Sequence, residues 1–338
     1  TEVTSAGMLR HPVFEKLRPD VSVADCRAPA DRDEALSQAV EASPPEPRLE
    51  LTRLDKIFWP VEAYTKGDLL AYYEAVWPWL APYLRDRPVV LTRYPDGIDG
   101  KFFYQKNAPE FTPDWATRQN LDGTDYFICN DLRTLLYVIN SGAIPLHVWH
   151  SRLASLERPD WLVLDLDPKE APFADVVEIA RHIHRMLRDL GAQHFAKTSG
   201  QDGIHILLPL AGQLDHAESR GLAEVLARTV CAELPEIATI TRPVAARGDK
   251  VYVDFLQNGR GKLIAAPLSV RPRPSAPVSM PLTIGQVTAR LDPTQWTIKT
   301  APARLRKSGD PMSDVLGEPI DVAGLLEALG RRLEAAAR

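Results

Sequence analysis

Apolar and polar positions follow two different periods along this chain, and together they predict a mixed α/β protein. Short apolar runs bounded by turn residues are typical of buried strands, whereas apolar residues three or four positions apart are typical of amphipathic helices. The first pattern predicts strands over 88–94, 161–168 and 251–255, and on both sides of a turn at 199–203. The second predicts helices that start at Thr65, Asp131 and Asp215, one that ends near Leu190, and a last one over 322–337.

The strand expected at 161–168 organises the chain. It ends in two aspartates, Asp165 and Asp167, and alternate residues of a strand point to the same side. Two neighbouring carboxylates repel each other unless a counter-charge is present. A hard divalent cation such as Mg²⁺ or Mn²⁺ takes oxygen ligands and would supply that charge. A pair of solvated aspartates at a strand end is the simpler alternative, and the two residues alone leave both open.

Two further blocks carry residue types suited to phosphate and metal. The turn between two apolar strands contains Ser199, Gly200 and Gly203 and is followed by His205. Glycines let a backbone approach a phosphate, and turn N–H groups can face it. The apolar strand at 251–255 supplies a third carboxylate, Asp254.

These three blocks, in this order, resemble the archaeo-eukaryotic primase superfamily. The resemblance is strongest to the polymerase domain of bacterial DNA ligase D and its standalone, ligase-C-associated relatives in actinobacteria, and it covers residues 49–300. It implies an α/β (α+β) fold in which an N-terminal α/β module packs on a catalytic module like an RNA-recognition motif, with a mainly antiparallel sheet. It also implies nucleotidyl transfer to a primer 3′-hydroxyl.

The same resemblance assigns roles to individual residues. Two divalent ions, Mn²⁺ or Mg²⁺, are expected on the three catalytic aspartates. The incoming nucleotide, an NTP in preference to a dNTP, is expected on His147, Ser199, His205, Arg247, Gln257, Lys262 and Arg271. DNA is expected on Arg53, Lys56, Lys66, Phe102 and Phe103.

The DNA residues also have local arguments. Lys66 is expected in the first turn of a helix capped by Thr65, where free N–H groups and the helix dipole favour an anion such as a 5′-phosphate. Arg53 stands where relatives carry an asparagine. Phe102 and Phe103 would point to opposite faces of an extended segment, so we expect one in the core and the other stacked on a base.

Proline-rich stretches suggest the domain boundaries. Residues 1–48 form an extension, with a short helix suggested at 31–40, that ends in a stiff linker at 42–48. Residues 49–300 are expected to form the primase-polymerase catalytic domain, with two interleaved modules. The many prolines of 267–319 predict loops, and 301–338 is expected to be a C-terminal loop and helix.

Composition limits the class of protein and its expected location in the cell. The apolar fraction of 45% suits a sizeable core, and no run approaches the roughly 18 apolar residues of a membrane span. With no signal-peptide pattern and three widely spaced cysteines, we expect a cytoplasmic, nucleoid-associated monomer. The net charge is −5, yet 242–273 holds seven Lys/Arg against two Asp/Glu, a block suited to phosphates.

The expected function is short gap filling in end joining or excision repair. The expected partners are gapped or broken DNA with a downstream 5′-phosphate, an ATP-dependent DNA ligase and Ku. Two alternatives remain open at this point. A haloacid-dehalogenase-type phosphatase also starts from an Asp-X-Asp strand, although Pro168 and Lys169 follow here. A non-catalytic nucleic-acid-binding module could also keep the fold.

Overall fold

The computed structural model describes residues 2–3, 9–10 and 49–336. The chain divides into two units, Thr1–Leu49 and Glu50–Arg338. In the first unit, β1 (Glu2–Val3) and β2 (Leu9–Arg10) form a short antiparallel pair. The helix suggested at 31–40 and the linker at 42–48 lie outside the described residues. The second unit holds every candidate site residue named above.

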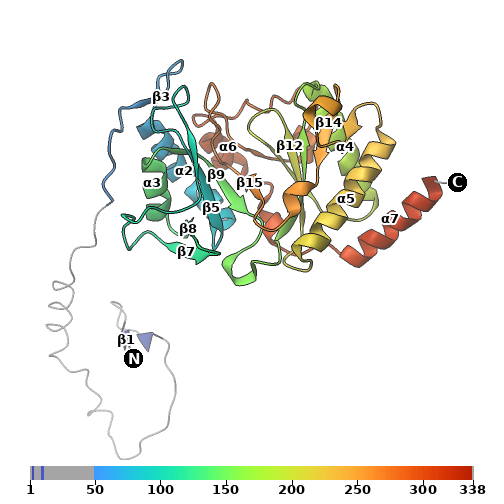
Figure 1. Ribbon diagram of the computed structural model, residues 1–338, viewed down its shortest axis with the longest axis horizontal. Helices are drawn as coiled ribbons and strands as arrows, with labels where there is room; N and C mark the ends of the chain where they lie inside the picture. Colours follow the sequence, from blue (N-terminus) through green and yellow to red (C-terminus); the bar gives the residue numbers. More distant parts are fainter. Residues whose placement is uncertain (1, 4–8, 11–48, 337–338) are drawn as a thin grey trace, which may run out of the picture. The chain divides into compact units, whose positions relative to one another are not determined.

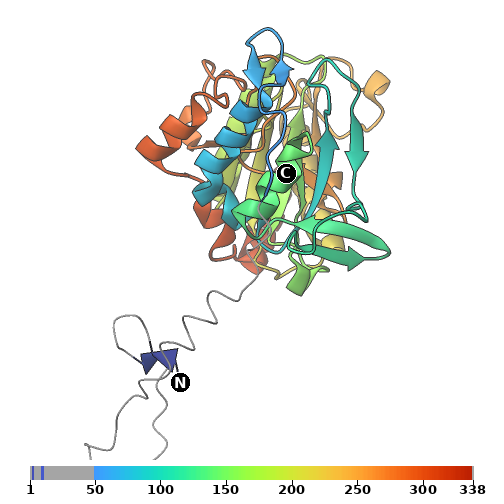
Figure 2. The ribbon, with the colours of Figure 1, turned by 90° about the vertical axis from the view of Figure 1, so that its left-hand side faces the viewer.

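One sheet, here called sheet I, is formed mainly by the first half of the second unit. Its helices α2 (Lys66–Leu84) and α3 (Leu132–Asn140) lie side by side in Figure 2 and contribute to the same apolar core. A hairpin of β3 (Ile57–Trp59) and β4 (Tyr64–Thr65) precedes α2. The strands run antiparallel in the order β15 (Leu263–Ala265), β9 (Ala143–Trp149), β5 (Pro88–Arg93), β8 (Thr124–Ile128) and β7 (Arg118–Leu121), with β6 (Phe103–Gln105) paired to β5.

A second six-stranded sheet, sheet II, carries the aspartate strands. Its order is β13 (Ala238–Thr239), β14 (Val251–Asp254), β10 (Trp161–Asp167), β12 (Ile204–Pro209), β11 (Phe195–Thr198) and β16 (Pro281–Leu282). All pairs are antiparallel except β13–β14, so the mainly antiparallel sheet expected from the sequence is confirmed. Helices α4 (Phe173–Asp189) and α5 (His216–Glu233) cover one face of this sheet (Figure 1).

The alternation of β10 places the aspartates between the two sheets. Leu162 and Leu164 point into the core formed with α4 and α5, whereas Trp161 and Val163 belong to the core shared with sheet I. Because side chains alternate along a strand, Asp165 and Asp167 continue the face of Trp161 and Val163. The carboxylates therefore emerge where the apolar contact between the sheets ends.

The two sheets are interleaved in sequence. After β14 of sheet II, the chain returns through β15 to pair with β9 of sheet I, which places Ala265 opposite His147. This crossing brings residues from both sheets to the same cavity. Short 3₁₀ helices connect the elements at Leu153–Ser155, Val244–Ala246, Leu256–Asn258, Ile284–Gln286 and Ser313–Leu316.

The C-terminal segment packs into both cores. The prolines predict loops over 267–319, but α6 (Ala301–Ser308) forms there with Pro302 in its first turn, a position that a helix tolerates because the missing N–H has no helical partner. The last helix, α7 (Val322–Ala336), forms as expected. Large apolar side chains of this segment are buried in both cores: Leu305, Met312 and Val315 in the first, and Ile320, Leu325 and Leu329 in the second.

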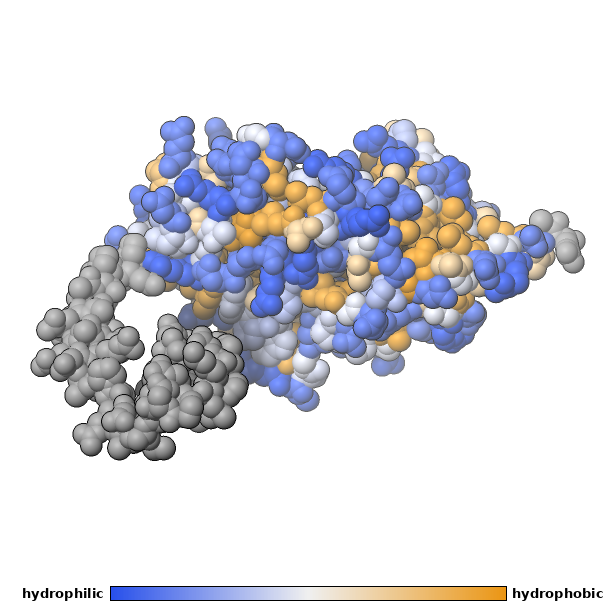
Figure 3. Space-filling model, turned by 90° about the horizontal axis from the view of Figure 1, so that it is seen from below, coloured by the Kyte–Doolittle hydropathy of each residue, from blue (hydrophilic) through white to orange (hydrophobic). Residues whose placement is uncertain are grey.

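The surface is mixed rather than uniformly polar. The face shown in Figure 3 carries hydrophobic patches separated by hydrophilic residues. Among the described residues, the aromatic side chains of Phe102, Phe103, Tyr104 and Phe111 have at least 45% of their surface exposed. No helix in the described part of the chain is long and apolar enough to cross a membrane.

Candidate active site

A row of four ionisable residues crosses sheet II. Asp254 on β14 lies opposite Asp165 on β10, Asp165 lies opposite His205 on β12, and His205 lies opposite Lys197 on β11. Directly opposed residues of antiparallel strands share a face, so all four side chains project to the same side. His205 Nε2 lies 3.3 Å from an oxygen of Asp165, and its Nδ1 lies 2.7 Å from Lys197 Nζ. The row thus reads acid, acid, histidine, lysine.

The pKa values of the two acids of this row are shifted in opposite directions. Burial alone would raise the pKa of Asp165, but His205, Lys197 and Arg271 outweigh it and lower that pKa. Asp254 has a raised pKa, first because it is buried and further because the charge of Asp165 lies nearby. Two adjacent carboxylates in which one resists ionisation are an arrangement that a bound cation would relieve.

Asp167, the third expected metal ligand, has a different partner. Its carboxylate accepts a hydrogen bond of 3.0 Å from Arg247, whose guanidinium stacks on Tyr252 and also donates to the carbonyls of Thr241 and Arg242. In residues 49–336 and the four described residues before them, no three acidic, histidine or cysteine side chains form a ready-made metal site. The oxygen donors of Asp165 and Asp254 fit a hard divalent cation, whereas Asp167 would first have to leave Arg247.

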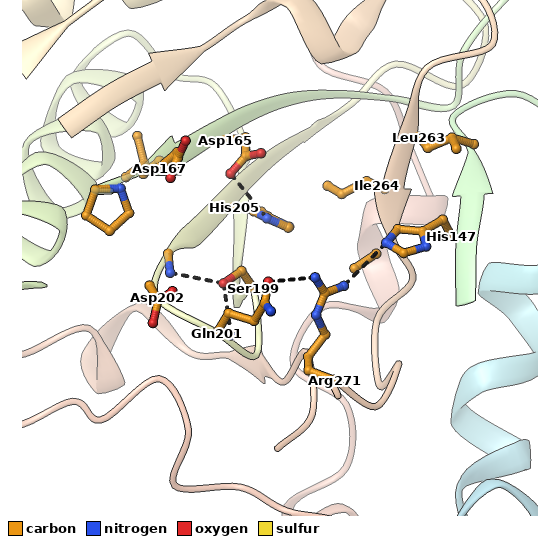
Figure 4. Close-up of a pocket in the computed structure, with 14 residues that line it drawn as sticks. His147, Asp165, Asp167, Ser199, Gln201, Asp202, His205, Leu263, Ile264 and Arg271 are labelled. Atoms are coloured by element: carbon orange, nitrogen blue, oxygen red, sulfur yellow. Dashed lines mark hydrogen bonds and ion pairs between the residues drawn. The ribbon is translucent and has the colours of Figure 1, made fainter. Parts of the chain in front are cut away.

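The face of the row opens into a cavity of about 220 Å³. Asp165, Asp167 and His205 line one side, and residues from sheet I and the segment after it line the other (Figure 4). There, Arg271 lies 3.4 Å from Nε2 of His147 and donates to the Gln201 side chain at 2.7 Å. Burial, and then the charge of Arg271, lower the pKa of His147 to about 3.

The serine-glycine turn is held by its own hydrogen bonds. Ser199 Oγ accepts from the N–H groups of Gln201 and Gly203, which leaves its O–H to donate toward the cavity. A Cβ at Gly203 would overlap the Leu166 carbonyl oxygen, and Gly200 has φ +74° against the backbone of 278–279. The glycines thus serve close packing against neighbouring strands, and two turn N–H groups already have partners. This corrects the expectation that the turn is open for backbone contact with phosphate.

The expected nucleotide residues do not all share one cavity. His147, Ser199, His205 and Arg271 line the first. Arg247, Gln257 and Lys262 line a second cavity, of about 390 Å³, together with Asp254 and two exposed arginines, Arg220 and Arg242. The Gln257 amide donates to Asp254 at 3.0 Å. In this structure the Gln257 side chain therefore binds the Asp254 carboxylate.

The three cations expected to bind a 5′-phosphate lie together. The pKa of Lys66 is lowered by its burial and then by the charges of Arg53 and Lys56, which places these three groups close enough to interact. Lys56 forms an ion pair with Asp96 at 2.6 Å. The backbone of Lys66 donates to the Lys56 carbonyl, so the β3–β4 hairpin does fold back against the start of α2.

One argument for that phosphate site was wrong. The first-turn N–H groups of α2 are not free, because those of Lys66, Gly67 and Asp68 donate to Lys56 O, Leu54 O and Thr65 Oγ1. Asp68 completes a capping box with Thr65 and adds a negative charge there. A phosphate at this position would depend on the three side chains.

The expectation that one of the two phenylalanines is core is also wrong. Phe102 is 54% exposed and Phe103 45% exposed. Phe102 stacks on Tyr94 with ring centroids 5.2 Å apart, and Arg93 lies over the Phe103 ring. Both rings thus remain at the surface, and both are available to contact bases.

Comparison with known proteins decides the family. A family model described as the LigD primase-polymerase domain matches residues 65–312. The chain belongs to this family. It is 34% identical over 283 residues to the bifunctional non-homologous end joining protein LigD of Bacillus subtilis, covering 83% of this chain and 46% of that protein. It is 29% identical to the multifunctional LigD of Pseudomonas aeruginosa, covering 98% of this chain and 41% of that protein.

A solved structure agrees with the family assignment. The polymerase domain of Mycobacterium tuberculosis ligase D, solved in complex with DNA, matches with a TM-score of 0.75 and 28% identity. The match covers 81% of this chain and all of that domain. The α/β fold and the primase-like nucleotidyltransferase class expected from the sequence are confirmed, and the phosphatase and the non-catalytic module are not supported. The chain spans less than half the length of the two LigD proteins.

Sequence reasoning missed three residues near the LigD-type site. Lys197 lies two residues before Ser199. The alternation of side chains along one strand does not show that Lys197 pairs with His205 on the next strand. Arg220 and Arg242 come from α5 and from the loop before β14, so only the tertiary structure brings them beside Asp254. The basic block at 242–273 was the one available signal for Arg242.

Proposed function

We propose that this protein is a DNA repair polymerase that adds nucleotides to a primer 3′-hydroxyl at short gaps and broken ends. The observation that carries the proposal is the row of Asp254, Asp165 and His205 facing a cavity lined by Ser199 and Arg271. Names of relatives support the setting, because both LigD proteins are named for non-homologous end joining. The similar polymerase domain of ligase D was solved with DNA.

In this reaction the primer 3′-oxygen attacks the α-phosphorus of the nucleotide. The bond from that phosphorus to the bridging oxygen breaks, pyrophosphate leaves, and the hydroxyl proton passes to solvent. Asp165, Asp167 and Asp254 would hold two divalent ions, Mn²⁺ or Mg²⁺. Such ions lower the pKa of the hydroxyl and stabilise the leaving pyrophosphate.

Protein groups hold the nucleotide in place. Ser199 O–H, the His205 ring and Arg271 are directed at one cavity and would donate to triphosphate oxygens. Lys262 and Arg247, in the neighbouring cavity, would neutralise phosphates that extend past Asp254. Arg247 must release Asp167 before all three carboxylates can act together.

His147 is the candidate to contact the sugar. With a pKa of about 3 it is neutral near pH 7, so it acts as a hydrogen-bonding group rather than as a cation. A ribose 2′-hydroxyl would offer His147 a hydrogen-bond partner that deoxyribose lacks. We therefore propose that NTPs are preferred over dNTPs.

The proposed partners follow from the repair setting. DNA carrying a downstream 5′-phosphate would bind Arg53, Lys56 and Lys66, and bases would stack on Phe102 and Phe103. An ATP-dependent DNA ligase would seal the filled gap, with Ku at broken ends. Such work would place the protein at the nucleoid, in the cytoplasm.

The decisive experiment is extension of a primed, gapped duplex with a 5′-phosphate, comparing NTPs with dNTPs in Mg²⁺ and in Mn²⁺. We expect metal-dependent addition of one to a few nucleotides and faster addition of NTPs. DNA binding without extension under any of these conditions would refute a polymerase. Equal efficiency for the two sugars would refute only the role given to His147.

A further inference from the structure

Lys197 is the one lysine among the described residues whose side chain is fully buried, and the mechanism above does not use it. Lysine is rarely buried without a specific partner. Here Nζ lies 2.7 Å from Nδ1 of His205 and 2.6 Å from Oγ of Ser279. Burial lowers the pKa of Lys197 well below its usual value, and the nearby charge of Arg271 adds to that. Burying this amine costs stability, which indicates a specific role for Lys197.

The donors and acceptors around Lys197 and His205 determine the direction of each hydrogen bond. Ser279 Oγ donates to the Thr198 carbonyl at 2.8 Å, so toward Lys197 it is the acceptor. On the other side of the ring, Nε2 of His205 faces a carboxylate oxygen of Asp165, which can only accept. Nε2 therefore carries a hydrogen. A neutral imidazole has one N–H, so its Nδ1 is an acceptor and Lys197 is its donor.

We propose that Lys197 is a positioning residue that fixes His205 in the tautomer with its N–H on Nε2, directed into the nucleotide cavity. With the hydrogen on Nδ1 instead, a lone pair on Nε2 would face Asp165 and any triphosphate oxygen, and the contact would be repulsive. Lys197 is not among the residues that line the nucleotide cavity, so it acts through the His205 ring. That the ring then binds triphosphate rests on the proposed function, whereas the tautomer does not.

The neighbouring strands explain why a lysine suits this position. Lys197 and His205 are directly opposed in the β11–β12 pair, so their side chains start from the same face of the sheet. Ser279 lies beside the end of β11, where its Oγ donates to Thr198 O and accepts from Lys197 Nζ, and its own N–H is bound to Ser269 O. The amine therefore sits between two fixed acceptors and has little freedom to turn away from His205.

The test is ¹⁵N NMR of histidine-labelled full-length protein without nucleotide, DNA or metal. The His205 signals are assigned by their loss in His205→Gln. In wild type we expect the Nε2–H tautomer, and in Lys197→Met, which keeps a similar shape but has no donor, a mixture of tautomers. Lys307→Met, on the exposed end of α6, is the matched control and should leave the spectrum unchanged.

A kinetic measurement separates positioning from mere packing. In Lys197→Met the nucleotide KM should rise in inverse proportion to the fraction of rings that keep the Nε2–H tautomer, about twofold for an equal mixture, while DNA affinity stays unchanged. Ser279→Ala keeps the donor at Nδ1, so it should retain the wild-type tautomer. An Nδ1–H ring in wild type, or a retained Nε2–H ring in Lys197→Met, would overturn the proposal. If Lys197→Met does not fold, Lys197→Gln takes its place, because its amide can accept from an Nδ1–H as well as donate to Nδ1 and should also give a mixture of tautomers. Because the spectra contain no substrate, they stand even if the protein proves not to polymerise.

Discussion

At the scale of single residues, the neighbouring carboxylates of Asp165 and Asp254 lower the stability of the folded protein. They face each other across two strands, and the raised pKa of Asp254 means that its ionised form is disfavoured in the folded state. A group with a raised folded pKa favours folding when it is protonated, and that benefit is lost as the pH rises through the folded value. At neutral pH the carboxylate of Asp254 is therefore retained against a stability cost.

This predicts opposite effects of Asp254→Asn on stability and activity. The variant removes the repulsion with Asp165 and keeps one oxygen for the Leu256 N–H, so its free energy of unfolding at pH 7 should equal or exceed that of wild type. Nucleotide addition should be abolished. Urea unfolding at pH 7 and primer extension give the two values. A clearly destabilised variant would mean that the hydrogen bonds of Asp254 outweigh the repulsion.

At the level of elements, the serine-glycine turn depends on close contact between β10 and β12. Gly203 leaves no room for a Cβ because the Leu166 carbonyl oxygen lies against it. We predict that Gly203→Ala costs about 1–3 kcal/mol of stability, since backbone has to shift, and that it also weakens nucleotide addition by moving Ser199.

Gly221 provides the matched control for that substitution. It lies exposed within α5, and nothing lies within 4 Å of a Cβ built there. Gly221→Ala should therefore raise stability by roughly 0.5–1 kcal/mol, because alanine loses less backbone entropy in a helix. Thermal unfolding of the two variants beside wild type makes the comparison. Equal effects of the two substitutions would show that the contact with Leu166 is not tight.

The β3–β4 hairpin and the start of α2 form the proposed phosphate-binding element. Because the N–H groups of α2 are already bonded, recognition of a 5′-phosphate should depend on Lys56 and Lys66 with Arg53. We predict that wild type prefers a gap with a downstream 5′-phosphate by about tenfold to a hundredfold and that Lys56→Ala/Lys66→Ala loses this preference. Binding to gapped DNA with and without the phosphate is the measurement. Equal binding of both gaps by wild type would exclude this pocket.

For the whole molecule, the C-terminal segment completes both cores. Six of its apolar side chains are buried there, and at about 1.5–3 kcal/mol each their burial is worth on the order of 10 kcal/mol. That is comparable to the whole stability of a typical domain. A chain ending at residue 300 should therefore not fold, whereas residues 50–338, one unit by contacts, should fold alone. Circular dichroism and thermal unfolding of the two fragments check this, and a cooperative transition in the shorter one would contradict it.

Local patterns were sufficient for the main elements and for the family. The period of apolar residues predicted β10, β12, β14 and the main helices, because each of these elements buries one face or both in a core. The three short blocks carrying Asp165, Ser199 and Asp254 led to the primase-polymerase family, because metal and phosphate chemistry restricts residue types at close spacing.

Contacts between distant segments required the tertiary structure. Whether a helix N–H is free depends on which carbonyl the hairpin brings to it, and this is why the start of α2 was misjudged. Phe102 and Phe103 both stay exposed because the neighbours of β6 leave them uncovered, which alternation along one strand cannot reveal. Lys197 was overlooked for the same reason: a buried lysine has meaning only through the strand paired beside it, and pairing is set by packing of the whole sheet.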